Sequence, residues 1–287
     1  MNVTIGALYK EGAALLTAAG VPAAEHDARA LLAHVLDVGP NDILLKAPDP
    51  MGAPQARVAR ELLDLRAGRM PLQYVTRTAY FGGLRLRSDD RALIPRQDTE
   101  LVVEAVLARL PEAAVQPDEF LADIGCGSGV IGLTLASRTP GLHVIMSDIA
   151  PGAVELAREN AMHLGLADRV TLLQGSYLEP LIEAGLSDRV SVMVCNPPYV
   201  RPNEMIMLDP EVHAEPLVAI ASPAADGLEG YRVLTTQIPA LTRLRLLAFE
   251  VGFAQEEEVA DMFKPLGRVE ILRDLSGIER VVIVHVG

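Results

Sequence analysis

From about residue 119 onward, segments with the pattern of strands alternate with segments with the pattern of helices, and this alternation constrains the fold most. Runs rich in β-branched residues predict the strands, and apolar residues at helical spacing predict the helices. Such alternation indicates a mainly parallel sheet covered on both faces, here with seven strands. Because only a short loop joins the last two strands, we expect the final strand to be antiparallel to its neighbour. The expected strands are 120–124, 143–146, 170–173, 190–195, 245–250, 269–272 and 281–286, and the expected helices are 129–137, 151–163, 227–243 and 256–263.

The residues before this region fall into two further parts. Residues 1–70 are predicted to form a bundle of four or five short helices, because apolar residues recur at helical spacing between Gly- and Pro-containing interruptions. Residues 71–95 are predicted to be a linker with a β-hairpin, because two β-rich runs flank Gly82-Gly83. The third part, residues 96–287, contains the predicted sheet.

Composition and charge argue against several kinds of function. With 38 acidic and 25 basic residues the formal charge is −13, which works against a basic face that would neutralise a nucleic-acid backbone. Two cysteines, Cys126 and Cys195, and six scattered histidines match no metal-site spacing. The chain has no run of ~18 apolar residues, and its N-terminus lacks the features of a signal peptide. We therefore expect a cytoplasmic monomer with no metal ion, no membrane contact and no direct contact with nucleic acid.

A glycine-rich loop follows the first strand of the sheet, with the sequence Gly125-Cys126-Gly127-Ser128-Gly129. Its glycines allow positive φ angles and let a ligand lie against bare backbone at the carboxyl end of the strand. Asp148 ends the next strand, where a carboxylate can accept hydrogen bonds from both hydroxyls of a ribose. The alternative role for Asp148 is to cap the helix that begins at Pro151. The loop alone leaves a dinucleotide and a sulfonium nucleoside both open as the cofactor.

The motif Asn196-Pro197-Pro198-Tyr199 follows the fourth strand. Two consecutive prolines remove two backbone donors and hold the chain rigid, which leaves carbonyl oxygens as acceptors. Asn196 adds a side-chain carbonyl, and Tyr199 adds a flat apolar face. This combination suits a planar NH2 group, whose two hydrogens need two acceptors while its plane stacks on the phenol ring. The motif therefore favours a sulfonium cofactor and an amino acceptor over a nicotinamide cofactor.

Together, the glycine loop and Asn-Pro-Pro-Tyr resemble the class I methyltransferases that use S-adenosylmethionine to methylate amino nitrogens. The chain resembles more specifically the HemK/PrmC family of protein N5-glutamine methyltransferases. This resemblance implies an α/β fold, in which a Rossmann-like class I methyltransferase domain follows the helical bundle and the hairpin linker. Beyond the two motifs, the stretches that carry the resemblance are 71–75, 93–100, 211–216, 226–232 and 274–280.

The resemblance also implies a reaction, in which a methyl group passes from S-adenosylmethionine to the amide nitrogen of a glutamine side chain and leaves S-adenosylhomocysteine. In this family the glutamine lies in the Gly-Gly-Gln motif of class I peptide chain release factors, and the helical domain would dock that partner. The cofactor-binding residues carried over by position are Gly125, Cys126, Gly127, Ser128, Gly129, Asp148, Tyr177 (against the adenine) and Asn196. The substrate-binding residues are Asn196, Pro197, Pro198 and Tyr199, and the predicted catalytic residues among them are Asn196, Pro197 and Tyr199.

We expect catalysis by positioning, with the Asn196 side-chain oxygen and the Pro197 carbonyl holding the two amide hydrogens and aiming the nitrogen at the methyl group. The alternatives are a related enzyme that acts on another protein glutamine, a small molecule or a nucleic-acid amino group, and a partner-binding protein without catalysis. Four departures from the family pattern bear on the substrate, and two of them are Gln97, where proline is common, and Ala214, where an aromatic residue is frequent. Residues 241–244 stand where a Gly-Gly turn is usual, and Arg77 stands where glycine is frequent.

Overall fold

The computed structural model describes residues 3–113, 116 and 118–287, which form two compact units. The helical unit contains Met1–Thr78 and Asp209–Ala214, and the sheet unit contains Ala79–Leu208 and Glu215–Gly287. Met1 and Asn2, which belong to the predicted helical domain, lie outside the described residues. The structure thus groups residues 71–78 with the helices and adds a segment from much later in the sequence.

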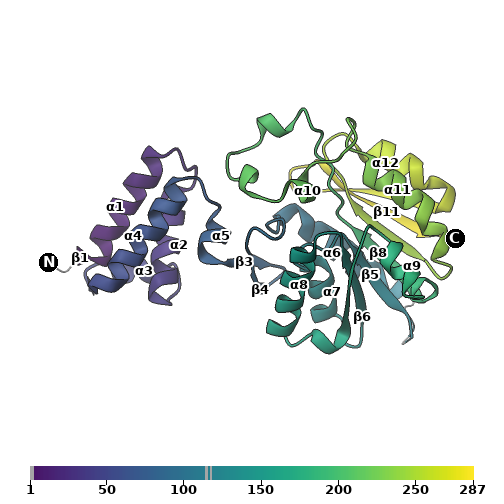
Figure 1. The fold of residues 1–287 in the computed structure, drawn as a ribbon, viewed down its shortest axis with the longest axis horizontal. Coiled ribbons are helices and arrows are strands. Elements are labelled where there is room, and N and C mark those ends of the chain that lie inside the picture. Colours follow the sequence, from purple (N-terminus) through teal and green to yellow (C-terminus); the bar gives the residue numbers. More distant parts are fainter. Residues whose placement is uncertain (1–2, 114–115, 117) are drawn as a thin grey trace. The chain divides into compact units, whose positions relative to one another are not determined.

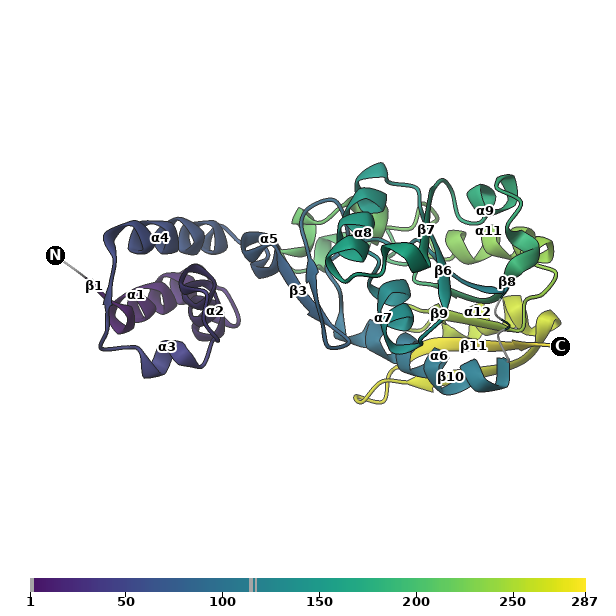
Figure 2. The same ribbon diagram turned by 90° about the horizontal axis from the view of Figure 1, so that it is seen from below.

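The helical unit is the predicted bundle of short helices, which the structure confirms (Figure 2). Its core contains the fully buried side chains of Leu8, Leu31 and Leu63, one from each of its three long helices. Two strands of two residues each also pair antiparallel here, and they are too short to produce an alternating sequence pattern. The elements are β1 (Val3–Thr4), α1 (Ile5–Ala18), α2 (Ala24–Leu36), α3 (Asp42–Leu45), β2 (Pro50–Met51), α4 (Ala53–Ala67) and α5 (Leu72–Thr76).

A network of ion pairs explains why the segment Asp209–Ala214 belongs to the helical unit. Arg66, only 5% exposed, donates to Asp27 Oδ2 at 2.8 Å and to Glu211 Oε1 at 2.8 Å. Arg69 donates to both oxygens of Glu211, at 2.7 and 2.5 Å. Burial alone would raise the pKa of Glu211, but these hydrogen bonds from Arg69 and Arg66 lower it to about 2. Glu211 is therefore held as a carboxylate among arginines of the helical unit.

The linker contains the predicted hairpin, formed by β3 (Thr78–Phe81) and β4 (Leu84–Arg87) on either side of Gly82-Gly83. Before it, Arg77 ends α5 in the left-handed conformation, with φ of 51°. Glycine adopts this conformation at no steric cost, which explains physically why glycine is frequent at this position of the family pattern.

The sheet has the seven strands expected from the alternating pattern, and their order is β10-β11-β9-β8-β5-β6-β7. Figure 1 shows β5, β6, β8 and β11 within it. Strand β11 is antiparallel to both of its neighbours, and the other described pairings are parallel. The predicted fold class and its antiparallel last strand are confirmed. The strands are β5 (Phe120–Ile124), β6 (His143–Asp148), β7 (Val170–Gln174), β8 (Val190–Cys195), β9 (Leu246–Glu250), β10 (Gly267–Arg273) and β11 (Glu279–Val286).

Helices cover both faces of the sheet, each over its own hydrophobic core. On one face the core contains side chains of α6 (Glu100–Ala113), α7 (Val130–Arg138) and α8 (Pro151–His163). On the other it contains side chains in and around α9 (Glu179–Glu183), α11 (Glu229–Gln237) and α12 (Glu256–Phe263). A further short helix, α10, spans Leu217–Ile220. The helix expected over 227–243 ends sooner, because α11 passes into a 3-10 turn at Ile238–Ala240, and at 241–244 the side chains of Leu241 and Leu244 are buried.

Asp123 is a fully buried acid inside the sheet, the second-to-last residue of β5. Its Oδ2 accepts the backbone N–H of Gly132 in α7 at 2.8 Å, which ties the strand to the helix. Burial raises the pKa of Asp123 to about 7, because a charged carboxylate loses its hydration there.

Replacement of Asp123 by Asn tests this burial through the pH dependence of stability. The folded chain keeps the Asp123 proton up to a pH of about 7, whereas the unfolded chain loses it near the ordinary value of 3.8. Between these values the folded state binds more protons, so rising pH lowers the free energy of unfolding by about 1.4 kcal/mol per pH unit from this group. We expect Asp123→Asn to lack this slope in urea unfolding measured across that range. Asp168→Asn, at an exposed position, is the control and should follow wild type. A pH profile of Asp123→Asn parallel to that of wild type would contradict the assignment.

Candidate active site

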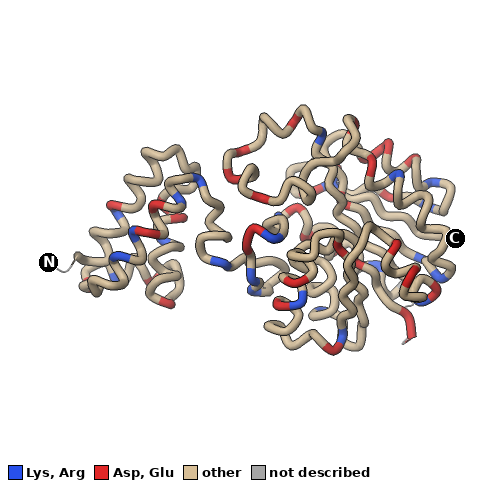
Figure 3. The backbone as a smooth tube through the Cα atoms, viewed as in Figure 1, with Lys and Arg blue, Asp and Glu red and all other residues tan. Residues whose placement is uncertain are grey.

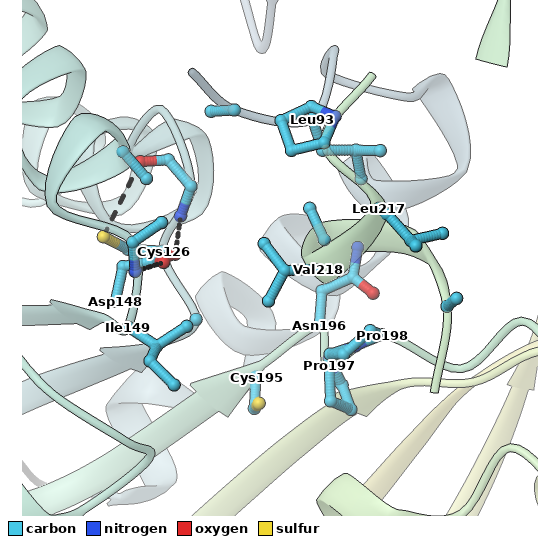
Figure 4. A pocket seen from close by; sticks show the side chains of 18 of the residues that line it. Leu93, Cys126, Asp148, Ile149, Cys195, Asn196, Pro197, Pro198, Leu217 and Val218 are labelled. Atoms are coloured by element: carbon cyan, nitrogen blue, oxygen red, sulfur yellow. Dashed lines mark hydrogen bonds between the residues drawn. The ribbon is translucent and has the colours of Figure 1, made fainter. Parts of the chain in front are cut away.

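A cavity of about 1010 Å³ lies at the carboxyl edge of the sheet, where β5, β6 and β8 end. Strand β5 is the point at which the strand order reverses, since the chain continues to β6 and β7 on one side and to β8 and β9 on the other. Loops that leave such a point diverge and form a crevice for ligands. Figure 4 shows Cys126, Asp148 and Ile149 on one wall and Asn196, Pro197 and Pro198 on the opposite wall.

The glycine loop forms part of the first wall. The N–H groups of Gly125 and Cys126 donate to the Ser147 carbonyl at 2.8 and 2.9 Å, which fixes the loop to the end of β6. Gly125 and Gly127 have φ of 71° and 56°, where a side chain would be strained. Ser128 also lines the cavity, and its buried hydroxyl has no hydrogen-bond partner among the described residues. The loop therefore presents backbone and one free hydroxyl to a ligand.

Gly129, predicted to bind the cofactor, does not line the cavity. It is the N-cap of α7 with φ of 84°, and a Cβ there would lie 2.9 Å from Leu133 Cδ1 and 3.3 Å from Ala157 Cβ. Glycine is required at this position for close packing of α7 and α8.

Asp148 lines the same wall and supports the loop. Its Oδ2 accepts the N–H of Gly127 and its Oδ1 that of Ala150, both at 2.9 Å. Burial raises the pKa of Asp148, while the bonds from Ala150 and Gly127 lower it. Ala150, not Asp148, is the N-cap of α8, although Asp148 does order the turn that precedes it. With its two oxygens and about four lone-pair sites, the carboxylate still has capacity to accept from a ligand hydroxyl.

Tyr177 lines the cavity beyond β7 in a left-handed conformation, with φ of 47°. Its carbonyl accepts the Ser147 hydroxyl at 3.1 Å. Burial raises the pKa of Tyr177 to about 12, so the ring is neutral and suited to packing against an apolar plane. Gly230 of α11 makes room here, since a Cβ would lie 2.8 Å from the Tyr177 hydroxyl and 2.9 Å from Pro197 Cβ.

The opposite wall is formed by the motif that follows β8. Asn196, Pro197 and Pro198 line the cavity. Within the described chain, nothing hydrogen-bonds to the Asn196 side chain or to the Pro197 carbonyl. Because Ile124 pairs with Cys195, Gly125 and Asn196 leave the sheet side by side. The structure therefore leaves the Asn196 side chain and the Pro197 carbonyl, within the part of the chain that it describes, without a partner on the wall opposite Cys126 and Asp148 (Figure 4).

Tyr199 does not line the cavity, although it was predicted to stack on the substrate amide. Its ring packs against the hydrophobic core on the α11 and α12 face of the sheet. Its hydroxyl donates to Glu250 Oε1 at 3.1 Å, and burial raises the pKa of Tyr199 well above the ordinary value. The motif shows that Tyr199 ends the turn, but the direction of its ring depends on residues distant in sequence.

Two rim segments of the cavity had no assigned role in the sequence. Residues 91–96 and 216–219 line it, and buried Glu215 joins them by accepting the Ile94 N–H at 2.8 Å and the Arg96 guanidinium. Both segments overlap stretches that carry the family resemblance. These two segments lie at the cavity because distant parts of the chain contact each other. The spacing of residues in the sequence does not reveal such contacts.

The two cysteines that line the cavity have unreactive thiols. Burial raises the pKa of the Cys126 and Cys195 thiols well above the ordinary value, so both remain protonated. The described residues contain no cluster of three His, Cys, Asp or Glu side chains arranged for a metal ion. They also contain no helix with the length and apolar character that crossing a bilayer requires.

Comparison with protein families and solved structures agrees with this architecture. The family described as PrmC N-terminal domain matches residues 7–76, and the family described as methyltransferase small domain matches residues 99–210. A crystal structure of the hMettl16 catalytic domain in complex with MAT2A 3'UTR hairpin 6 has a TM-score of 0.56 to this chain. It is 15% identical and covers 81% of this chain and 82% of its own, so the likeness is one of fold alone.

Curated relatives are similar over nearly the whole chain. The release factor glutamine methyltransferase of Cereibacter sphaeroides is 38% identical over 272 residues, which cover 93% of each chain. That of Moorella thermoacetica is 36% identical over 287 residues, or 99% of each chain. That of Deinococcus radiodurans is 36% identical over 96% of each chain. With both family domains, the glycine loop, Asp148 and the turn after β8 in place, the chain belongs to the family of release factor glutamine methyltransferases.

Proposed function

We propose that this chain transfers a methyl group from S-adenosylmethionine to the side-chain amide nitrogen (N5) of the glutamine in the Gly-Gly-Gln motif of class I peptide chain release factors. The observation that carries the proposal is the pair of free acceptors, Asn196 Oδ1 and the Pro197 carbonyl, across the cavity from Asp148. Membership in the family supports the identity of the substrate.

The residues of the first wall fit the cofactor. The unpartnered Ser128 hydroxyl and the bare backbone of the glycine loop suit the methionine end, and Asp148 suits the ribose hydroxyls. Tyr177 offers an apolar face for the adenine. The cavity volume of about 1010 Å³ is large enough for a nucleoside with its amino acid together with a glutamine side chain. When bound, S-adenosylmethionine supplies a methyl group on a sulfonium, and S-adenosylhomocysteine remains after the transfer.

Asn196 and Pro197 would hold the glutamine amide as the nucleophile. An amide nitrogen reacts poorly because its lone pair is delocalised into the carbonyl. Two acceptors that bind its two hydrogens favour a pyramidal nitrogen whose lone pair points away from them, toward the first wall. Positive charge that develops on the nitrogen is stabilised by the same two oxygens. Pro198 keeps the turn rigid, so the acceptors are in place before the substrate arrives.

No deprotonated side chain is required before the transfer. Cys195, at the end of β8 beside the turn, keeps its proton because burial raises its pKa. The methylated nitrogen is strongly acidic and loses its extra proton to water. The residues of the turn therefore act by position and by their dipoles.

The charge distribution favours a protein substrate over nucleic acid. Figure 3 shows Lys and Arg interleaved with Asp and Glu along the chain. Many arginines are neutralised by ion pairs, among them Arg60, Arg66, Arg69, Arg87, Arg91, Arg109, Arg138, Arg158, Arg232, Arg243, Arg245 and Arg268. Arginines that are already paired with carboxylates are less available to bind phosphates. We further propose that the enzyme acts as a monomer in the cytoplasm, with the helical unit as the docking surface for the release factor.

The proposal is tested by offering several acceptors to the enzyme together with S-adenosylmethionine labelled in its methyl group. The acceptors are a purified release factor, the same factor with the motif glutamine changed to alanine, a different glutamine-bearing ribosomal protein, and DNA. We expect label on the unmodified release factor alone. Label on the alanine variant, on the ribosomal protein or on DNA would assign a different substrate.

Asn196→Ala tests the acceptor role of the turn. Because one of two preorganised contacts to the reacting nitrogen is lost, we expect turnover on the release factor to fall by a factor on the order of 10²–10³. Binding of S-adenosylmethionine, measured by isothermal titration, should be retained. Near-wild-type turnover of Asn196→Ala would remove Asn196 from the mechanism.

Asp148→Ala tests the ribose contact on the other wall. Hydrogen bonds to a charged group contribute about 1.5–3 kcal/mol, so we expect the Kd for S-adenosylmethionine to rise about 10- to 150-fold. Asp168→Ala, at an exposed position, is the matched control and should bind like wild type. An unchanged Kd for Asp148→Ala in isothermal titration would show that the carboxylate does not contact the cofactor.

A further inference from the structure

The turn after β8 is supported from behind by two buried polar side chains, Glu250 and Gln255, each only 2% exposed. Glu250 is the last residue of β9, the strand that pairs in parallel with β8. The last pair between these strands is Cys195 with Phe249, so the next residues along them are Asn196 and Glu250. A carboxyl group thus lies behind the proposed acceptor turn, outside the cavity lining.

Glu250 holds the side chain that ends the turn. Its Oε1 accepts the Tyr199 hydroxyl at 3.1 Å. Its own backbone carbonyl accepts the hydroxyl of Tyr231, a fully buried residue of α11, at 2.7 Å. The Tyr199 ring is therefore fixed to a strand and, through that strand, to a helix.

Gln255 holds the main chain at the same place. Its Nε2 donates to the Tyr199 carbonyl at 3.1 Å and to the Asp226 carbonyl at 3.2 Å. Its Oε1 accepts the N–H of Gly252 at 3.0 Å. One buried amide thus satisfies three backbone groups from three separate loops, which is possible only when all three loops are in place.

Two glycines allow the loops joined by Gln255 to approach each other closely enough for these hydrogen bonds. At Gly227, with φ of 81°, a Cβ would lie 2.4 Å from the Tyr199 carbonyl and 2.3 Å from Gln255 Nε2. At Gly252 a Cβ would lie 2.9 Å from Tyr199 Cδ2. These distances are too short for any side chain, so the backbone on both sides of Tyr199 is enclosed.

We propose that Glu250 and Gln255 are positioning residues of the methyl transfer, which hold Tyr199 and thereby keep Asn196 Oδ1 and the Pro197 carbonyl in the geometry that binds the substrate amide. This inference rests on the proposed role of Asn196 and Pro197. Tyr199 contributes through its hydroxyl and its carbonyl, behind the cavity wall. Small displacements of a positioned group lower the rate of the chemical step strongly, while a cofactor held by the other wall is unaffected.

The test compares Tyr199→Phe, Glu250→Leu, Glu250→Gln and the double variant Tyr199→Phe/Glu250→Leu. We expect Tyr199→Phe and Glu250→Leu each to lower kcat on the release factor about 10- to 100-fold. The Kd for S-adenosylmethionine should remain within about twofold of wild type. Glu250→Gln keeps an oxygen that accepts the Tyr199 hydroxyl, so it should recover most of the turnover lost in Glu250→Leu. Tyr80→Phe, on a side chain that is 76% exposed, is the matched tyrosine control.

The double variant separates positioning from stability. Tyr199→Phe leaves the buried Glu250 carboxyl with one side-chain donor fewer, the Thr99 hydroxyl remaining, and the added Glu250→Leu removes this under-satisfied group. The double variant should therefore have a higher Tm than Tyr199→Phe, while its kcat remains as low as that of either single variant. Recovery of kcat together with Tm would show that the pair serves stability alone and would overturn the inference.

Asn196→Ala, measured in parallel, distinguishes failure of this inference from failure of the proposed function. If Asn196→Ala abolishes turnover while Tyr199→Phe and Glu250→Leu act like wild type, the turn is catalytic and needs no such support. If Asn196→Ala itself turns over normally, the proposed function fails first, and the inference fails with it.

Discussion

The parallel pairing of β5 with β6 on one side and β8 on the other is the constraint on which the site depends. Because Ile124 is level with both Ser147 and Cys195, the residues that follow the three strands leave the sheet at the same edge. A shift of one residue in either register would turn the side chains of that strand to the opposite face. The two walls of the cavity therefore face each other as a result of hydrogen bonds within the sheet.

Hydrogen bonds from polar groups at the ends of the strands fix the loops relative to the sheet. The Ser147 carbonyl holds the glycine loop, Asp148 holds Gly127, and Glu250 holds Tyr199. In each case a residue at the end of one strand orders the loop that follows its neighbour. A buried polar group without a hydrogen-bond partner costs free energy. Loop conformations in which these bonds are broken are therefore less stable than the native ones. The base of the cavity is accordingly held by hydrogen bonds between the ends of neighbouring strands and the loops that follow them.

The sequence predicts much of this arrangement, because periodicity and chain order determine a parallel sheet and its carboxyl edge. Four of the five residues of the glycine loop line the cavity together with Asp148, Tyr177 and Asn196, and their roles in binding stay predictions. The features that the sequence does not reveal depend on contacts between residues that are distant in the chain. Gly129 has the right motif position but serves helix packing, and the ring of Tyr199 points into the core because Glu250 binds its hydroxyl. Likewise, no local pattern indicates that Glu211 belongs with the arginines of α4 and the turn that follows it.

The ion pairs of Glu211 with Arg66 and Arg69 have a consequence for how such a chain can be rearranged in evolution. The helical unit is discontinuous in sequence, since it includes Asp209–Ala214 from between two segments of the sheet unit. Recombination at a single point near residue 78 would bring in a foreign bundle and leave Glu211 without matching cations. An exchange that keeps these ion pairs would have to replace the bundle and the distant segment together, although they are separated by about 130 residues of sequence.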